Sequence, residues 1–146
     1  MCFREAEGGA FESAESDIRA LLDADAGPPV ERKADQYGYT WLICRRDPSE
    51  LPELVTDVHA VNSSLENAGF GPSLLCSLIG FAGADDRKLG LVYLYKTGTF
   101  YPFAPEDGER RDNALELQVR GALADDLTIE PNLTRWMALF GAPGLS

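Results

Sequence analysis

The stretch Leu89–Pro105, LGLVYLYKTGTFYPFAP, decides the fold that this sequence predicts. Apolar and aromatic residues alternate along Leu89–Lys96, and this period of two indicates a β-strand. Both faces of the strand are apolar, so we expect it to be central in a sheet, covered on both sides or on one side plus an interface. Gly98 can adopt the positive φ of a tight turn. Because Pro102 has no N–H to donate, the second arm, Thr99–Ala104, should be short and lie at a sheet edge.

Other elements are predicted around this hairpin from the spacing of apolar residues. Leu74–Ala82 is an apolar run of strand length, which would make a three-stranded meander with the hairpin. Val30–Ala34 and Tyr39–Arg45 form either a hairpin or one bent strand with a bulge at Gly38, and we favour the hairpin. Helical spacing predicts three helices, Phe11–Ala24, Leu51–Ala68 and Asp112–Leu127. The predicted class is α+β, with an antiparallel sheet of about five strands and three main helices packed against it.

Details of the helices and of the C-terminal segment can also be predicted. Ser49 is a suitable N-cap for the second helix, and Gly69 is a suitable residue for the left-handed position after its end. On the third helix, Glu116 and Arg120 have the i,i+4 spacing of an exposed ion pair. We expect residues 129–146 to fold back and cap the core.

Composition limits the class of protein. With 146 residues, one domain covering 1–146 is expected, and the net charge of −11 argues against nucleic-acid binding and against adhesion to anionic lipid. The three cysteines are an odd count without a C-x-x-C pair, which favours a reducing compartment. The sequence has no apolar run long enough for a transmembrane helix and no signal-peptide pattern.

The sequence contains no catalytic motif. His59 is the single histidine and has no partner at metal-ligand spacing, so no metal or cofactor is expected. Two alternatives stay open from the residues alone. Cys76 could be the nucleophile of a small hydrolase with His59 as its base. A pocket under Trp41 and Tyr95 could instead serve a ligand-sensing module.

One group of residues combines basic and aromatic side chains, the types that are enriched at protein interfaces. It lies in the second arm of the hairpin and before the third helix, and we predict that it binds a partner. In the alternative interpretation, the aromatic residues are core and the arginines are solvated or paired to acids. The predicted contact residues are Lys96, Phe100, Tyr101, Phe103, Arg110 and Arg111.

Four runs of the chain resemble the PspA-associated protein family PspAB, an actinobacterial family linked to the phage-shock response to envelope stress. They are Tyr37–Ile43, Val55–Ala82, Leu89–Pro105 and Glu109–Leu127. The resemblance implies a non-enzymatic cytoplasmic adaptor for PspA, a coiled-coil membrane-remodelling protein. The adaptor would meet the inner face of the membrane only indirectly. Relatives extend further upstream, so we expect a family-like N-terminal segment to be missing here. The apolar hairpin also suggests a homodimer.

Overall fold

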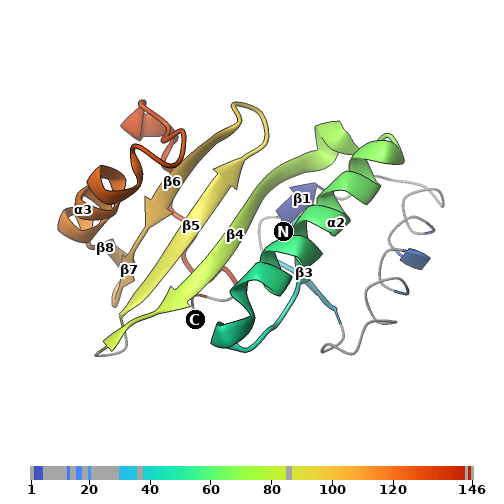
Figure 1. The fold of residues 1–146 in the computed structure, drawn as a ribbon, viewed down its shortest axis with the longest axis horizontal. Helices are drawn as coiled ribbons and strands as arrows, with labels where there is room; N and C mark the ends of the chain where they lie inside the picture. The colour runs from blue at the N-terminus through green and yellow to red at the C-terminus, as the bar shows by residue number, and fades with distance from the viewer. Residues whose placement is uncertain are drawn as a thin grey trace. The chain divides into compact units, whose positions relative to one another are not determined.

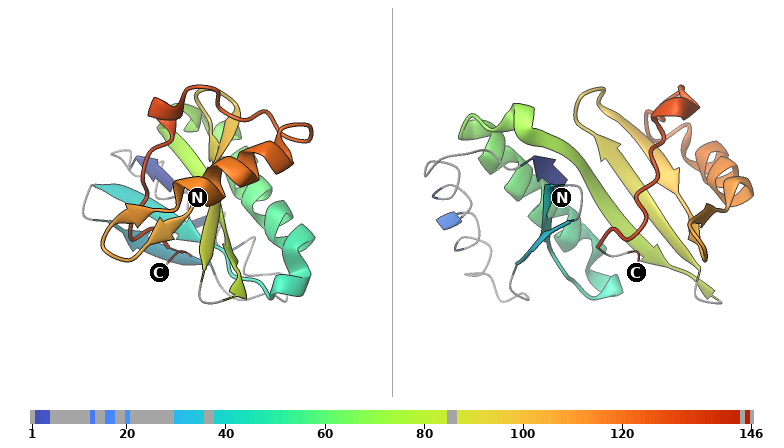
Figure 2. Two further views of the ribbon diagram at one scale, coloured as in Figure 1. Left: turned by 90° about the vertical axis from the view of Figure 1, so that its left-hand side faces the viewer. Right: turned by 180° about the vertical axis from the view of Figure 1, so that it is seen from behind.

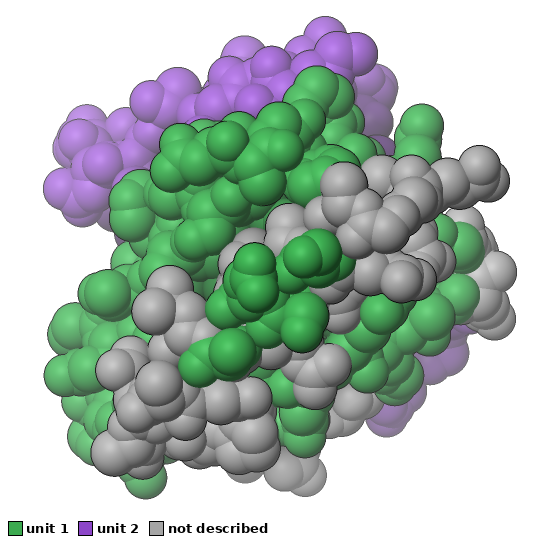
Figure 3. All heavy atoms as spheres, turned by 90° about the vertical axis from the view of Figure 1, so that its right-hand side faces the viewer, with its two compact units in different colours: residues 1–75 green, residues 76–146 purple. Residues whose placement is uncertain are grey.

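The computed structural model describes residues 2–4, 13, 16–17, 20, 30–35, 38–84, 87–143 and 145. The chain divides into two compact units, residues 1–75 and 76–146, which Figure 3 colours separately. Each unit is described by itself below. Both contain antiparallel strands and one described α-helix, so the predicted α+β class is confirmed.

The strands of the first unit are β1 (Cys2–Arg4), β2 (Glu31–Ala34) and β3 (Tyr39–Ile43), and β3 lies between the other two. Because β2 and β3 pair antiparallel from Glu31 with Ile43 to Ala34 with Thr40, the favoured hairpin is confirmed over the single bent strand. Gly38 has a φ of 83°, which explains why glycine is required in this turn.

The helix of the first unit, α2 (Leu51–Asn67), follows a short 3-10 turn, η1 (Pro48–Glu50). The predicted cap at Ser49 is wrong. Asp47 precedes the turn and accepts from the Ser49 N–H, and this hydrogen bond lowers the pKa of the Asp47 carboxyl. Pro48 occupies the first position of η1, so the capping residue is the one before it, Asp47.

The end of α2 follows the prediction. Gly69 has a φ of 90° and donates to the Glu66 carbonyl, and Phe70 donates to the Leu65 carbonyl, a Schellman ending. At the other end, Arg46 holds the helix to the segment after β3 through Asp57, with Nε 2.9 Å from Oδ2. The hydrogen bond to Asp57 raises the pKa of Arg46.

The second unit is built on a meander of β4 (Leu74–Ala82), β5 (Lys88–Leu94) and β6 (Thr99–Phe103), with β5 in the centre (Figure 1). The predicted meander is thus confirmed. Gly98 turns the chain between β5 and β6 with a φ of 67°. Among the described residues, β1 to β3 and β4 to β6 make six strands in all, where we predicted about five.

Three smaller elements and a helix complete the second unit. A two-stranded ribbon of β7 (Pro105–Glu106) and β8 (Arg110–Arg111) leads to α3 (Asn113–Leu123), and η4 (Leu133–Arg135) lies in the C-terminal segment. Asp112 caps α3 by accepting from the Leu115 N–H at 3.0 Å. The structure gives bounds for two α-helices, α2 and α3, where we predicted three. Of the expected helix Phe11–Ala24 only residues 13, 16–17 and 20 are described, and these are helical. Neither α2 nor α3 is long and apolar enough to cross a membrane.

The C-terminal segment caps one face of β5 and β6, as predicted (Figure 2, right). The Trp136 ring stacks on Tyr101 with centroids 6.1 Å apart, and Phe140 meets Phe103 edge-on at 5.2 Å. Further along, the segment reaches Gly90, where a Cβ would lie only 3.0 Å from Leu145 Cδ1. The glycine of the central strand is therefore a point of close packing.

Candidate functional site

The predicted contact residues do not share one environment. Tyr101 and Phe103 are almost fully buried, with 1% and 0% of their surface exposed, beneath the C-terminal segment. The Tyr101 hydroxyl donates to the Met137 carbonyl at 2.9 Å, and burial raises the pKa of the Tyr101 phenol. These two side chains form core, as the alternative interpretation of the sequence had it.

Arg111 is also part of the internal structure. Its Nε lies 2.9 Å from Glu116 Oε2, its Nη1 donates to the Trp136 carbonyl at 2.7 Å, and its guanidinium lies 5.0 Å from the centre of the Phe103 ring. Glu116 is 2% exposed and also accepts from the Ala104 N–H. The predicted outward pair of Glu116 with Arg120 is therefore wrong, because the carboxylate turns inward to bind Arg111 and the end of β6.

Three of the predicted residues reach the surface. Lys96 is exposed in the β5–β6 turn. Arg110 is exposed on β8, where its Nε donates to the Asp107 carbonyl at 3.3 Å. Phe100 is half-buried, with its ring 4.8 Å from that of Tyr93 on the opposite face from Tyr101. Partner binding by this surface stays a prediction, with Lys96 and Arg110 as its exposed members.

The outer edge of β6 is occupied by other parts of the second unit. The Phe100 N–H donates to the Thr128 carbonyl at 2.9 Å, and the Phe100 carbonyl accepts from the Glu130 N–H at 2.8 Å. Ala104 donates to Glu116 and accepts from Asp112. Pro102, between them, has no N–H to offer. A homodimer made by strand addition here would first have to displace these contacts. The homodimer itself stays a prediction.

The residues considered for catalysis or ligand sensing lie in different environments, and His59, Tyr95 and Trp41 each contact a different side chain. Cys76 is buried in β4, whereas His59 is exposed on α2 with its Nε2 3.4 Å from the Ser63 hydroxyl. Tyr95 bonds to Ser77 at 2.6 Å. Trp41 is buried and donates to Asp35 at 3.1 Å.

Two further observations concern titratable groups among the described residues. Burial raises the pKa of the Cys44 thiol, which reduces its thiolate fraction. Across the described ranges, no group of three or more His, Cys, Asp or Glu residues could hold a metal ion.

The comparison with protein families gives the identity of the chain at family level. The model of PspAB, PspA associated protein B, matches residues 1–144. The chain belongs to the PspAB family. The resemblance inferred from the sequence is confirmed, and it links the chain to the PspA system. Searches among curated proteins and among solved structures found no match.

This PspAB member also has a cavity that our sequence reasoning missed. It has a volume of about 460 Å³ and lies in the second unit, where the β4–β5 hairpin approaches α3. In the sequence this hairpin turn looked only polar. The available signal was Phe81, an aromatic residue at the end of a strand, followed closely by Arg87 and Lys88. The lining residues are Phe81, Ala82, Gly83, Ala84, Arg87, Lys88, Leu89 and Leu115.

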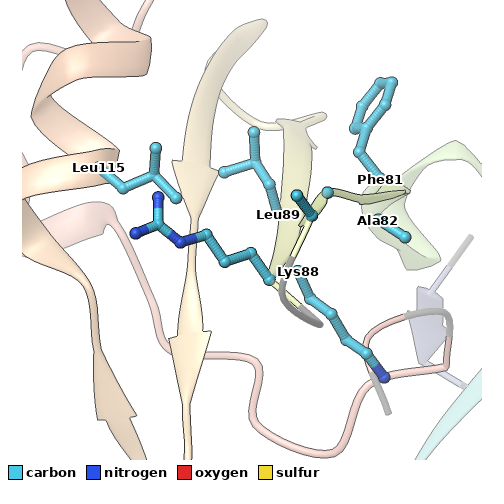
Figure 4. A pocket seen from close by; sticks show the side chains of 8 residues that line it. Phe81, Ala82, Lys88, Leu89 and Leu115 are labelled. Atoms are coloured by element: carbon cyan, nitrogen blue, oxygen red, sulfur yellow. The ribbon is translucent and has the colours of Figure 1, made fainter.

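Figure 4 shows how the labelled side chains are arranged. Leu89 from β5 and Leu115 from α3 lie toward one another, and Lys88 extends away from Leu115. Phe81, at the end of β4, is 39% exposed. The cavity therefore combines an apolar wall with two cationic residues, Arg87 before β5 and Lys88 at its start.

Proposed function

We propose that this chain is a non-enzymatic accessory protein of the PspA system that acts by binding other proteins. The observation that carries the proposal is the match of the PspAB family over residues 1–144. We place the protein in the cytoplasm, with contact to the inner face of the membrane only through its partner. Cys2, Cys44 and Cys76 are not joined in a disulfide, which supports a reducing compartment.

The two alternative functions gain no support from the positions of their residues. A cysteine hydrolase needs a reachable thiolate next to its base, but Cys76 is buried and His59 is exposed beside Ser63. A sensing pocket under Trp41 and Tyr95 needs free polar groups, but the indole N–H and the phenol hydroxyl both bond to other side chains. Protein binding accordingly remains the function that we propose.

The test is capture of PspA from the same organism by the immobilised chain. A Lys96→Glu, Arg110→Glu double variant reverses the two exposed charges of the predicted surface. It leaves the ion pair of Arg111 with Glu116 intact. We expect it to lower capture by roughly tenfold at low salt, since interface arginines often contribute that much. The control is Lys33→Glu with Arg120→Glu, which makes the same charge change at other exposed positions.

Three results are informative. Loss of capture in the test variant, with the control unaffected, would support both the partner and the surface. Equal capture by the folded test variant would place the binding surface elsewhere on the chain. If wild-type protein captures no PspA, the proposed function is wrong.

A further inference from the structure

The cavity at the β4–β5 turn has the form of a docking site rather than an enclosed ligand chamber. Its volume of about 460 Å³ is at the lower end of the range for binding sites, about 300–1,000 Å³. One rim consists of Ala82, Gly83 and Ala84, which have little or no side chain. These three residues are exposed, so a partner segment can approach the backbone of this rim.

The apolar wall of the cavity is available for contact. Phe81 is 39% exposed, and Leu89 and Leu115 are half-buried. These side chains come from β4, β5 and α3, so their positions are fixed by regular structure on both sides (Figure 4). An apolar side chain of a partner would gain buried area here without reorganising the site.

The cations at the cavity have no partner within the described part of the chain. Arg87 is exposed and Lys88 half-exposed, and neither makes an ion pair there, whereas Arg45, Arg46, Arg111 and Arg135 all do. Arg87 and Lys88 are adjacent in the sequence and lie beside an apolar wall, in a chain whose net charge is −11. Such a site complements a carboxylate that neighbours an apolar side chain.

We propose that this cavity docks a segment of a partner protein in which a large apolar side chain lies next to an Asp or Glu. The apolar side chain packs against Phe81, Leu89 and Leu115, and the carboxylate pairs with Arg87. The inference rests on the proposed function, since PspA is the partner with which it is tested. Anionic membrane is the weaker candidate, because recognition of anionic lipid uses clusters of about 4–8 basic residues and the cavity offers two.

The test measures the affinity of purified full-length chain for purified PspA by titration calorimetry. Arg87→Glu should weaken binding by about tenfold or more, and Phe81→Thr, which keeps a strand-forming residue, should weaken it similarly. Lys33→Glu, the same charge change on an exposed strand of the other unit, should alter affinity less than threefold. Circular dichroism of each variant checks that the fold is retained.

A variant of opposite sign tests the charge argument. Asp85 and Asp86 directly precede Arg87 in the sequence and add two negative charges to this part of the chain, which disfavour an incoming acid. Asp85→Asn with Asp86→Asn should therefore tighten binding of PspA. Weaker binding by this variant would contradict recruitment of a carboxylate to the turn.

The remaining outcomes separate the inference from the proposed function. If PspA binds wild type and Arg87→Glu equally, the docking site is wrong and the proposed function stands. If wild type does not bind PspA, both are wrong. If wild type instead floats with phosphatidylglycerol vesicles in the absence of PspA, and Arg87→Glu does not, the cavity recognises lipid and the protein-docking inference is overturned.

Discussion

At the scale of single residues, the polar atoms of an aromatic or arginine side chain decide its role. Where these atoms are buried and hydrogen-bonded inside the protein, the side chain stabilises the fold, and where they are exposed, it can bind a partner protein. Tyr101 and Arg111 have the composition of an interface, but their polar atoms bond to carbonyl and carboxylate groups of the same unit. Lys96, in the β5–β6 turn, and Arg110, on β8, are also cationic but remain exposed. The same residue types thus have different roles within one short stretch.

Tyr101 provides a prediction about pH. Burial raises the pKa of its phenol, so the folded protein retains a proton that the unfolded chain loses above the usual tyrosine pKa of about 10. The stabilisation is fully present below pH 10 and is lost as pH rises beyond it. Tyr101→Phe should lower the free energy of unfolding by about 1 kcal/mol at pH 7, because the bond to the Met137 carbonyl is lost.

Above pH 10 the Phe variant should lose stability less steeply than wild type, because it has no phenol to ionise at this position. Urea unfolding at intervals from pH 7 to 11 measures both effects. Equal slopes for the two proteins would show that ionisation of Tyr101 is not linked to unfolding.

At the scale of elements, the C-terminal segment completes the sheet of the second unit. Thr128 and Glu130 bond to the backbone of β6, and Trp136 packs on Tyr101 while its indole N–H donates to the Glu130 carbonyl at 2.9 Å. Glu130 also accepts from the Thr99 hydroxyl at 2.7 Å. Trp136 therefore holds the segment in the position that covers the β6 edge.

Trp136→Ala should open this edge. Removing a buried Trp should lower the free energy of unfolding by about 3–5 kcal/mol. The Phe100 amide, which bonds to Thr128, should then exchange with solvent faster relative to the amides that join β4 to β5, and the protein should self-associate at high concentration. Hydrogen exchange and light scattering measure these effects. Met137→Ala is the control, since its side chain is 63% exposed and its loss should change stability by less than about 0.5 kcal/mol.

The elements were predictable from sequence where local chemistry specifies them. The glycine turns at Gly38 and Gly98 and the end of α2 at Gly69 each require a backbone conformation that few other residues adopt. The edge contacts could not be predicted, because Phe100 and Thr128 are far apart in the chain. Glu116 looked like a surface residue because its partner Arg111 is not at helical spacing. The cavity, assembled from three elements, was missed for the same reason.

At the scale of the whole molecule, each unit contains one of the two tryptophans, Trp41 in the first and Trp136 in the second. Both are buried, so each reports on the packing of its own unit. This arrangement allows the expectation of a single domain to be examined by fluorescence. Cooperative unfolding of the chain would require the two probes to change together.

If the chain is one domain, each single-tryptophan variant should unfold in one transition, with the same midpoint by fluorescence and by circular dichroism. Trp136→Phe leaves Trp41 as the probe, and Trp41→Phe leaves Trp136. Within each variant, we expect tryptophan emission and far-ultraviolet circular dichroism to give the same urea midpoint. A fluorescence midpoint that differs from the circular dichroism midpoint would instead show that the two units unfold separately. Because both midpoints are measured on the same variant, the stability lost through the substitution does not affect the comparison.

The covered edge of β6 has a consequence for how the protein is made. Synthesis proceeds from the N-terminus, so Phe100 leaves the ribosome before Thr128 and Glu130, by an interval on the order of seconds. During that interval the outer edge of β6 lacks its hydrogen bonds to Thr128 and Glu130. Only Pro102, which has no N–H, then limits pairing with another strand. A nascent chain stalled in this window, or a chain cut there by a protease, would offer its edge to any extended peptide nearby. Such a fragment would be a natural client for chaperones and degradation.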